Sequence, residues 1–441
     1  MSSELLVALM FVGVVLGSFT GFPIAFVLGS LGLGFGIFLM DLPVLGSLFL
    51  TRIWGLICEP ILAAVPLFIF MGCMIEKSGL AELLYDTIYH WLGPVRGGLA
   101  LATVVFCTIF AATTGIVGAS VTAMGLLALP TMLKRGYDIP LATGCICAGG
   151  TLGILIPPSI MLIIYGPAGG VSVAQLYAGA FIPGFVLSAL FMGYIGIRSW
   201  MNPKLCPALP PEEREKRTLK DYLHQGLTSL LPTLFLILAV LGTIFFGICA
   251  PTEAAGIGAL GSIILAAVYR RFNLGMLKDV SLITFRITAM ILFVTVGASL
   301  FTSVFLYGGG GSAITDLLMK WNLGPWGVLA VVMVIVFFLG ALIDWIGILL
   351  IIVPIFSPLL KSLGFDPLWV GLLICVNLQM SFLTPPFAYA IFYLKGIAPP
   401  QVQLSHIIRG VFPYVLLQAT GLILCILFPQ LCLWLPSLMG K

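Results

Sequence analysis

Two proline pairs mark the places in this 441-residue chain where binding chemistry is expected. Pro157-Pro158 interrupts the apolar stretch Gly144–Gly166, and Pro385-Pro386 interrupts a similar stretch near the C-terminus. Proline removes a backbone donor and glycine loosens a helix, so each stretch should unwind in its middle. Inside a membrane, unwound backbone is tolerated only where protein or a polar cavity satisfies it. The two breaks therefore predict a binding site rather than simple membrane anchors.

Small and polar residues gather around these breaks and around two further interruptions. Helix ends carry unsatisfied amides or carbonyls worth about half a charge each, so amide ends can hold a carboxylate. Carbonyl ends and hydroxyls can coordinate Na⁺. Each residue alone is a weak signal, because a membrane serine or threonine usually bonds its own helix. The candidate substrate-binding and ion-binding residues are Thr113, Thr114, Gly115, Gly118, Ser120, Gly149, Gly150, Thr151, Pro157, Pro158, Gly340, Asp344, Asn377, Gln379, Ser381, Thr384, Pro385 and Pro386. The candidate Na⁺ ligands among them are Thr114, Gly118, Thr151, Gly340, Asp344 and Thr384.

Asp344 is the only charged residue between Trp321 and Leu360. A charge in the middle of an apolar run costs at least ~2.5 kcal/mol. Two interpretations remain open: a Na⁺ ligand or orienter of the ion site, and a structural carboxylate that bonds backbone amides at a hairpin tip. Glu253, in contrast, follows Pro251 and is typical of a carboxylate that faces the amide end of its own helix.

The composition indicates a polytopic helical membrane protein. Apolar residues make up 61% of the chain and charged residues only 8%, whereas soluble domains carry about 25% charge. The apolar runs are continuous, which excludes the alternation of a membrane barrel. The net charge of +4 requires no nucleic acid, and scattered cysteines and three separated histidines predict neither a metal cluster nor a cofactor. Loops that are rich in basic residues should lie on the cytoplasmic side, next to the membrane lipids.

Two apolar stretches are too long to cross a membrane once. Gly97–Leu133 lacks any charge and would run about 55 Å as a straight helix, against a hydrocarbon core of about 30 Å. Its small and polar segment Ala112–Ser120 predicts a re-entrant hairpin of two half-length helices. Two full spans joined by a tight turn are the alternative. Trp321–Leu360 repeats this pattern around Asp344. Other spans are expected near Leu5–Gly21, Pro23–Met40, Leu56–Ile75, Leu176–Ile197, Leu230–Ile248, Ala254–Val268 and Ile283–Tyr307.

The two units are related by an internal repeat. A shift of 228 positions superposes Asp138 on Asp366, the first proline pair on the second, and Tyr165 on Tyr393. The basic loops Arg198–Lys220 and Arg270–Lys278 should be cytoplasmic. Counting crossings from these loops places Asp138 on the cytoplasmic side and Asp366 outside. The repeats are therefore expected to be inverted, as in secondary transporters.

The predicted fold is an all-α polytopic membrane protein with inverted repeats, each holding a re-entrant hairpin and a broken transmembrane helix. We divide the chain into five parts. These are N-terminal scaffold helices (1–96), a first repeat transport unit (97–200, with hairpin 97–133 and broken helix 139–169), a cytoplasmic loop with scaffold helices (201–306), a second repeat transport unit (307–400, with hairpin 326–360 and broken helix 367–396) and a C-terminal scaffold helix (401–441).

Several stretches resemble a known family. GFPIAFVLG, ATTGIVGASVTAMG, AGGTLGILIPPSIMLIIYG, PTEAAGIGA and VNLQMSFLTPPFAYAIFYLKGIAPP are similar to the large membrane subunit of tripartite ATP-independent periplasmic (TRAP) transporters, in the ion-transporter superfamily. The likeness runs from about Gly21 to Pro400. It implies Na⁺-coupled uptake of an organic acid across the bacterial inner membrane by an elevator motion. It also implies a periplasmic solute-binding protein and a small membrane subunit, here a separate chain. No phosphate-binding loop is present, in keeping with ion rather than ATP coupling.

Two other classes of function have different requirements. A stand-alone carboxylate:Na⁺ symporter of the same superfamily would need no binding protein. An intramembrane enzyme would need a catalytic set such as serine with histidine, or paired acids at matched depth, and the sequence shows none. We therefore expect a transporter and not an enzyme.

Overall fold

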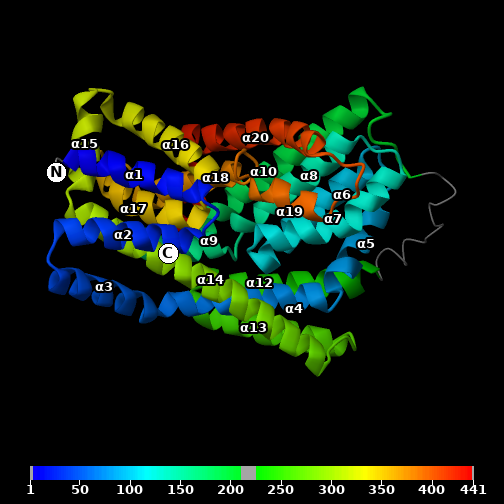
Figure 1. The fold of residues 1–441 in the computed structure, drawn as a ribbon. Coiled ribbons are helices and arrows are strands. Elements are labelled where there is room, and N and C mark those ends of the chain that lie inside the picture. Colours follow the sequence, from blue (N-terminus) through cyan, green and yellow to red (C-terminus); the bar gives the residue numbers. More distant parts are fainter. Residues whose placement is uncertain (1–2, 210–224, 440–441) are drawn as a thin grey trace.

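A computed structural model describes residues 3–209 and 225–439, and within these ranges the chain is helical with no strand. Nine of the described helices are long and apolar enough to cross a membrane. The predicted loop Arg198–Lys220 lies partly outside the described residues. Figure 1 shows the arrangement of the helices. The described helices are α1 (Ser3–Phe19), α2 (Ile24–Leu39), α3 (Leu42–Ile57), η1 (Pro60–Ala63), α4 (Ala64–Lys77), α5 (Leu80–Leu92), α6 (Gly98–Thr114), α7 (Val117–Lys134), α8 (Ile139–Thr151), η2 (Leu152–Ile154), α9 (Ile160–Gly169), α10 (Val173–Met201), η3 (Gly226–Leu230), α12 (Leu231–Phe245), α13 (Pro251–Val268), α14 (Leu274–Tyr307), α15 (Gly310–Lys320), α16 (Gly324–Leu342), α17 (Trp345–Ser362), α18 (Pro367–Ser381), α19 (Tyr389–Ile397), α20 (Leu404–Leu427) and α21 (Gln430–Met439).

The internal repeat extends over nearly all of the described chain. A shift of 228 positions carries α7 onto residues 345–362, which are the bounds of α17. The same shift carries α1 onto α12, α2 onto α13 and α5 onto α15, with ends that differ by at most two residues. It also places α3, η1 and α4 together on the single helix α14. The repeat therefore includes the outer helices, well beyond the matched residues that revealed it in the sequence.

The two hairpins are inverted relative to each other. In Figure 1, α6 and α7 lie toward the right-hand end of the molecule, whereas α16 and α17 lie toward the left-hand end. Their tips, at Gly115 and Asp344, nevertheless line one shared cavity. Two full crossings would carry these tips to opposite faces, so the arrangement confirms re-entrant hairpins and inverted repeats. The arms have 17 and 18 residues in the first hairpin, about 26 Å each, so they are longer than the predicted half-length helices.

The hairpins and broken helices interlock in a symmetric pattern. The arm α7 contacts α8 of its own repeat and α19 of the other repeat, and α17 likewise contacts α18 and α9. Each hairpin thus packs against the first half of its own broken helix and the second half of the opposite one. The last long helix, α20, packs against both α8 and α18.

Two expectations about the outer helices have different outcomes. The predicted span Leu56–Ile75 is wrong in its start, because the chain runs through α3 before an interruption and then continues through η1 and α4. The expectation for Glu253 is confirmed. Helix α13 begins at Pro251, and the Glu253 carboxylate accepts a hydrogen bond of 3.0 Å from the Ala250 N–H, one of the amides at this helix start.

We expect Gly410→Ala to destabilise the protein. The backbones of α8 and α20 approach so closely that a methyl group on Gly410 would overlap with the Pro140 carbonyl. Overpacking of this kind costs about 1–3 kcal/mol, which should lower the thermal denaturation midpoint in detergent micelles. Gly193→Ala in α10 is the matched control, because nothing lies within 4 Å of its added methyl group. Equal midpoints for the two variants would contradict the close approach of α8 and α20.

Candidate functional site

A cavity of about 330 Å³ lies where the two hairpin tips meet. The first tip contributes residues 115–118 and the second contributes residues 342–346. Helix α14 and the turn between α1 and α2 form the facing wall, and α19 contributes two tyrosines. The remaining lining residues are Ser18, Phe22, Pro23, Ile24, Ile154, Ile160, Ile287, Met290, Ile291, Val294, Phe382, Phe387, Tyr389 and Tyr393. The cavity thus joins both repeats to outer helices of the bundle.

The first tip presents a free helix start to the cavity. Gly115 adopts a left-handed conformation with φ of +59°, which ends α6, and Ile116 is extended before α7 begins. No side chain caps the amide end of α7. The Thr114 and Ser120 hydroxyls lie 3.2 Å apart and join the two arms across the tip. The first amides of α7 therefore form an uncapped positive end of a helix dipole beside the cavity.

The second tip carries its own carboxylate. Asp344 precedes α17, and its side chain accepts a hydrogen bond of 3.3 Å from the Ile346 N–H. It occupies the position that Ile116 occupies in the first repeat. The bond agrees with the structural interpretation of Asp344, but the carboxylate also lines the cavity, as an ion ligand must. The two tips thus differ in charge at equivalent positions.

The cavity lacks a positive side chain. Asp344 is the only charged residue among its described lining residues, and the polar side chains besides it are Ser18, Tyr389 and Tyr393. Nor does the described part of the chain hold any group of three or more metal-ligating His, Cys, Asp or Glu residues. An anion at the start of α7 would therefore share an apolar cavity with the Asp344 carboxylate. Two such negative groups would repel each other in the absence of a compensating positive charge.

Thr151 and Gln379 join the two broken helices at their symmetry axis. They are 228 positions apart, which makes them equivalent in the repeat, and the Gln379 Nε2 donates to the Thr151 Oγ1 at 3.3 Å. Gln418 of α20 donates to the same oxygen at 3.0 Å, and the hydroxyl itself donates to the Ala148 carbonyl at 2.7 Å. A hydroxyl has one proton and two lone pairs. All three are used here, so the Thr151 oxygen holds the helices together.

Oxygen atoms without partners gather between α16 and α18. The Asn377 Nδ2 donates to the Met333 carbonyl at 2.6 Å, whereas the Asn377 Oδ1 and Ser381 Oγ are buried without a hydrogen-bond partner in the described part of the chain. Ser381 lies directly against Gly340, where a Cβ would overlap with its hydroxyl. A buried polar atom without a partner costs about 1–3 kcal/mol. These oxygens therefore suit a cation or a water molecule.

The other predicted residues serve packing or lie in the unwound segments. A methyl group on Gly149 would meet Cys107, and one on Gly150 would overlap with Val121, so both glycines let α8 approach the first hairpin. The Thr113 and Thr384 hydroxyls donate to carbonyls of their own helical turns at 2.7 and 2.9 Å. The proline pairs lie where the chain is unwound, before α9 and α19. Of the predicted set, Gly115, Gly118 and Asp344 line the cavity.

Sequence reasoning missed the aromatic and outer walls of the cavity. Tyr389 and Tyr393 line it, and a Cβ on Gly118 would meet the Tyr393 ring at 3.1–3.3 Å. The matched pair Tyr165 and Tyr393 in the repeat was the available signal. The contributions of α14 and of the α1–α2 turn carry no such signal, because they are mostly ordinary apolar residues.

Inverted repeats with paired hairpins and broken helices around a central cavity define the architecture of a secondary membrane transporter. Comparison with known proteins agrees with this class. Residues 11–431 match the family described as "Tripartite ATP-independent periplasmic transporter, DctM component", and the chain belongs to that family.

Relatives of known description span most of the chain. The C4-dicarboxylate TRAP transporter large permease protein DctM of Pseudomonas aeruginosa is 33% identical over 86% of this chain and 87% of its own length. The ectoine/5-hydroxyectoine TRAP transporter large permease protein UehC of Ruegeria pomeroyi is 34% identical, with 86% of each chain covered. The solved structure of the Alcanivorax borkumensis YdaH transporter has a similar fold, with a TM-score of 0.63 and 17% identity over 94% of this chain and 96% of that chain. The family consists of transporter permeases, so the chain is a transport component and not an enzyme.

We expect Thr151→Val to destabilise the protein more than Thr151→Ser. Valine keeps the shape but removes the acceptor for Gln379 and Gln418, which leaves two buried amide donors without partners. Each loss costs about 1–3 kcal/mol. Serine keeps the hydroxyl and serves as the matched control. The thermal denaturation midpoint measures the difference, and a midpoint for the valine variant at or above that of serine would contradict a structural role for these bonds.

Proposed function

We propose that this protein is the large permease subunit of a TRAP transporter and takes up an organic acid together with Na⁺ across the bacterial inner membrane. One observation carries the proposal: the uncapped start of α7 and the Asp344 carboxylate face the same cavity, and no basic side chain lines it in the described part of the chain. The relatives support the substrate class, since their names specify C4-dicarboxylate and, for an Escherichia coli protein 28% identical, 2,3-diketo-L-gulonate.

The substrate carboxylate binds at the first tip in this proposal. Backbone amides at Val117 and Gly118 begin α7, and their dipole favours a negative group. The Tyr393 ring packs against Gly118 and borders this end of the cavity. In this proposal, backbone amides bind the substrate carboxylate. The rest of the substrate molecule then contacts the side chains that line the cavity.

Na⁺ binds where oxygen atoms remain available near the two tips. At the second tip these are Asp344, Thr384 and the carbonyl region of Gly340, with Asn377 and Ser381 close by. At the first tip, the Thr114 and Ser120 hydroxyls and the backbone at Gly118 form the corresponding group. Thr151 is left out of the proposed ligands because its hydroxyl already makes three hydrogen bonds.

The net charge of the transported group explains why co-transport of Na⁺ would make uptake of an organic anion favourable. An anion alone would be expelled by the inside-negative potential, whereas each positive charge that moves inward gains ~2.3 kcal/mol per 100 mV. Two Na⁺ with one monocarboxylate would carry a net charge of +1 inward. The ions also neutralise Asp344 and the bound carboxylate, which would otherwise repel each other in a cavity of about 330 Å³.

We propose an elevator motion in which the hairpins and broken helices move as one body. Helix α20 belongs to this moving body, because it packs closely on α8 and bonds Thr151 through Gln418. This assignment differs from the sequence-based division, which placed residues 401–441 in the scaffold. Helix α14 contacts α2 and α4, and α4 contacts α13, so these four helices form the scaffold core in this proposal. The cavity lies at the boundary between the two bodies, where motion would expose it to either side.

A small membrane subunit and a periplasmic solute-binding protein complete the proposed transporter. The isethionate TRAP transporter permease protein DctMQ of Oleidesulfovibrio alaskensis is 30% identical, and this chain covers 57% of its length. In the present proposal the small subunit is a separate chain, and the binding protein delivers substrate to the face where α18 begins. The alternative is a stand-alone carboxylate:Na⁺ symporter that uses the same cavity.

Reconstitution into proteoliposomes tests the function. With the small subunit present, we expect uptake of a radiolabelled carboxylate from a panel of C4-dicarboxylates and 2-oxo acids only when the binding protein and an inward Na⁺ gradient are both supplied. Uptake by the large subunit alone, with Na⁺ but without a binding protein, would favour the stand-alone symporter. Equal uptake after replacement of Na⁺ by K⁺ would contradict Na⁺ coupling.

Asp344→Asn tests the charge at the second tip. Asparagine caps a helix about as well as aspartate, so the variant should fold, while the lost carboxylate should weaken Na⁺-driven uptake about tenfold or more, as expected for an interaction with a charged group of about 1.5–3 kcal/mol. Asp366→Asn is the matched control, because Asp366 caps α18 through the Trp369 N–H but does not line the cavity. Unchanged Na⁺ dependence in Asp344→Asn would remove Asp344 from the ion site.

A further inference from the structure

The scaffold contacts the second arms of the two hairpins differently. Helix α14 packs against α17, the second arm of the second hairpin. The shift of 228 positions relates this contact to α4 and α7, yet no comparable contact joins α4 to α7 in the described part of the chain. A pocket of about 450 Å³ lies there instead, between Glu76 of α4 and Ala123 and Leu127 of α7. The second arm is therefore closed against the scaffold in one repeat and open in the other.

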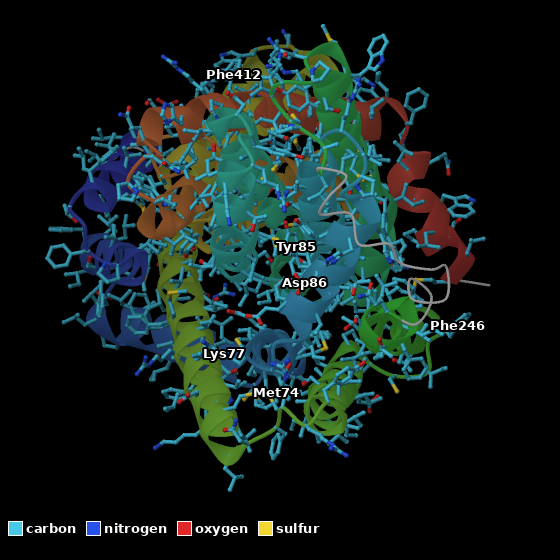
Figure 2. The ribbon with its side chains drawn as sticks, turned by 90° about the vertical axis from the view of Figure 1, so that its right-hand side faces the viewer. Met74, Lys77, Tyr85, Asp86, Phe246 and Phe412 are labelled. Carbon is cyan, nitrogen blue, oxygen red and sulfur yellow. The ribbon has the colours of Figure 1, made fainter. Side chains whose placement is uncertain are left out.

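The open pocket lies in line with the central cavity. Helix α7 lines the cavity with residues 117–118 and the pocket with Ala123, and α14 lines the cavity with Ile287 and the pocket with Met276. Both spaces therefore lie along the gap between α7 and α14. Figure 2 shows the end of the molecule where this gap reaches the surface, with Lys77 of α4 beside α14.

A hydrogen bond fastens α14 to α17 at the closed contact. The Thr302 hydroxyl donates to the Leu350 carbonyl at 2.9 Å, and both residues are buried. In a regular helix this carbonyl would accept the N–H of residue 354, but Pro354 stands there and has no N–H. Thr302 therefore supplies the donor that α17 itself lacks. Hydroxyl side chains commonly satisfy a carbonyl that proline has freed in a membrane helix.

The first repeat lacks both parts of this arrangement. Thr302 corresponds to Met74, which has no hydroxyl, and Pro354 corresponds to Leu126, which has an N–H. Helix α7 thus keeps the backbone bond that α17 loses. A contact between α4 and α7 would form without such a hydrogen bond, and separation of α14 from α17 would leave the Leu350 carbonyl without its donor.

We propose that Thr302, Leu350 and Pro354 form a latch that holds the moving body in the conformation shown, and that in a second conformation the latch opens while α7 packs against α4. The inference rests on the elevator motion in the proposed function. A buried carbonyl without a donor disfavours a conformation by about fivefold or more, so the latch sets the balance between the two conformations. Thr302 is a positioning residue, since it does not line the cavity.

Cross-linking of α4 to α7 measures the second conformation. The repeat places Met74 and Thr122 at the positions equivalent to the bonded pair of the latch. With Met74→Cys and Thr122→Cys together, a short bifunctional thiol reagent should cross-link the helices at a rate proportional to the population of the second conformation. The background lacks Cys58 and Cys249, which are not buried, and Cys73, which adjoins the new cysteine.

Thr302→Val should raise this cross-linking rate about fivefold or more, because valine keeps the shape but removes the donor of the latch. Thr302→Ser keeps the hydroxyl and should leave the rate unchanged. Thr295→Val is the matched control, since Thr295 is also buried in α14 but donates to the Ile291 carbonyl of its own helix at 2.8 Å. An unchanged rate in Thr302→Val, or an equal rise in Thr295→Val, would overturn the latch.

Pro354→Ala tests why the latch is needed. Alanine returns an N–H to the Leu350 carbonyl, so the cross-linking rate should rise, and Thr302→Val should then change it by less than about twofold. An undiminished effect of Thr302→Val in this background would contradict the role of Pro354. The thermal denaturation midpoint shows that each variant is folded, and the Thr302 variants decide the proposal if Pro354→Ala does not fold.

The outcomes distinguish the latch from the proposed function. An unchanged cross-linking rate, together with uptake that still requires the binding protein and Na⁺, would overturn the latch alone. Absence of cross-links between α4 and α7 in every variant would contradict the second conformation, and with it the elevator motion of the proposed function.

Discussion

Backbone polar groups within a membrane must find partners inside the protein, and this requirement governs the whole structure. Four helix breaks border the cavity: two hairpin tips and two unwound segments that contain the proline pairs. Each hairpin tip lies against the unwound segment of its own repeat: a Cβ on Gly115 would meet the Pro158 carbonyl, and the Phe387 N–H donates to the Ala341 carbonyl at 3.2 Å. The arms α7 and α17 also pack against α19 and α9 of the opposite repeat. Each repeat thus covers its own breaks, and the inverted arrangement adds the second half of the opposite broken helix to the surroundings of each hairpin.

The two repeats are alike where their broken helices meet, but they differ at the hairpin tips. At the centre, Thr151 and Gln379 occupy equivalent positions and bond each other, which fixes the two broken helices at a common depth. At the tips, equivalent positions hold Ile116 and Asp344, so one helix start is uncapped and the other is capped by a carboxylate. The two broken helices are thus related by symmetry, whereas the two tips depart from it: one side of the cavity has an uncapped helix start and the other has a carboxylate.

Sequence reasoning located the features whose signals are local. Glycine, proline and a single intramembrane charge predicted the breaks at Ala112–Ser120 and Asp344, and the matched proline pairs revealed the repeat. Helix α3 was not predicted as an element, because the only span expected in this part of the chain was Leu56–Ile75, which joins the end of α3 to η1 and α4 across their interruption. The bond between Thr151 and Gln379 was also not predicted, although both residues were candidates, because it depends on how distant helices meet.

The residues of the cavity wall on α14 could not be predicted from the sequence at all. Met290 and Ile291 of α14 line it, yet nothing in their residue types separates them from the other apolar residues of a membrane helix. Their role follows from the position of α14 against the hairpin tips. The four residues of α14 that line the cavity are all apolar, so this helix offers neither a charge nor a hydrogen-bonding side chain to a group in the cavity. A charged group in the cavity must therefore find its partners at the two hairpin tips, where the uncapped start of α7 and the Asp344 carboxylate lie.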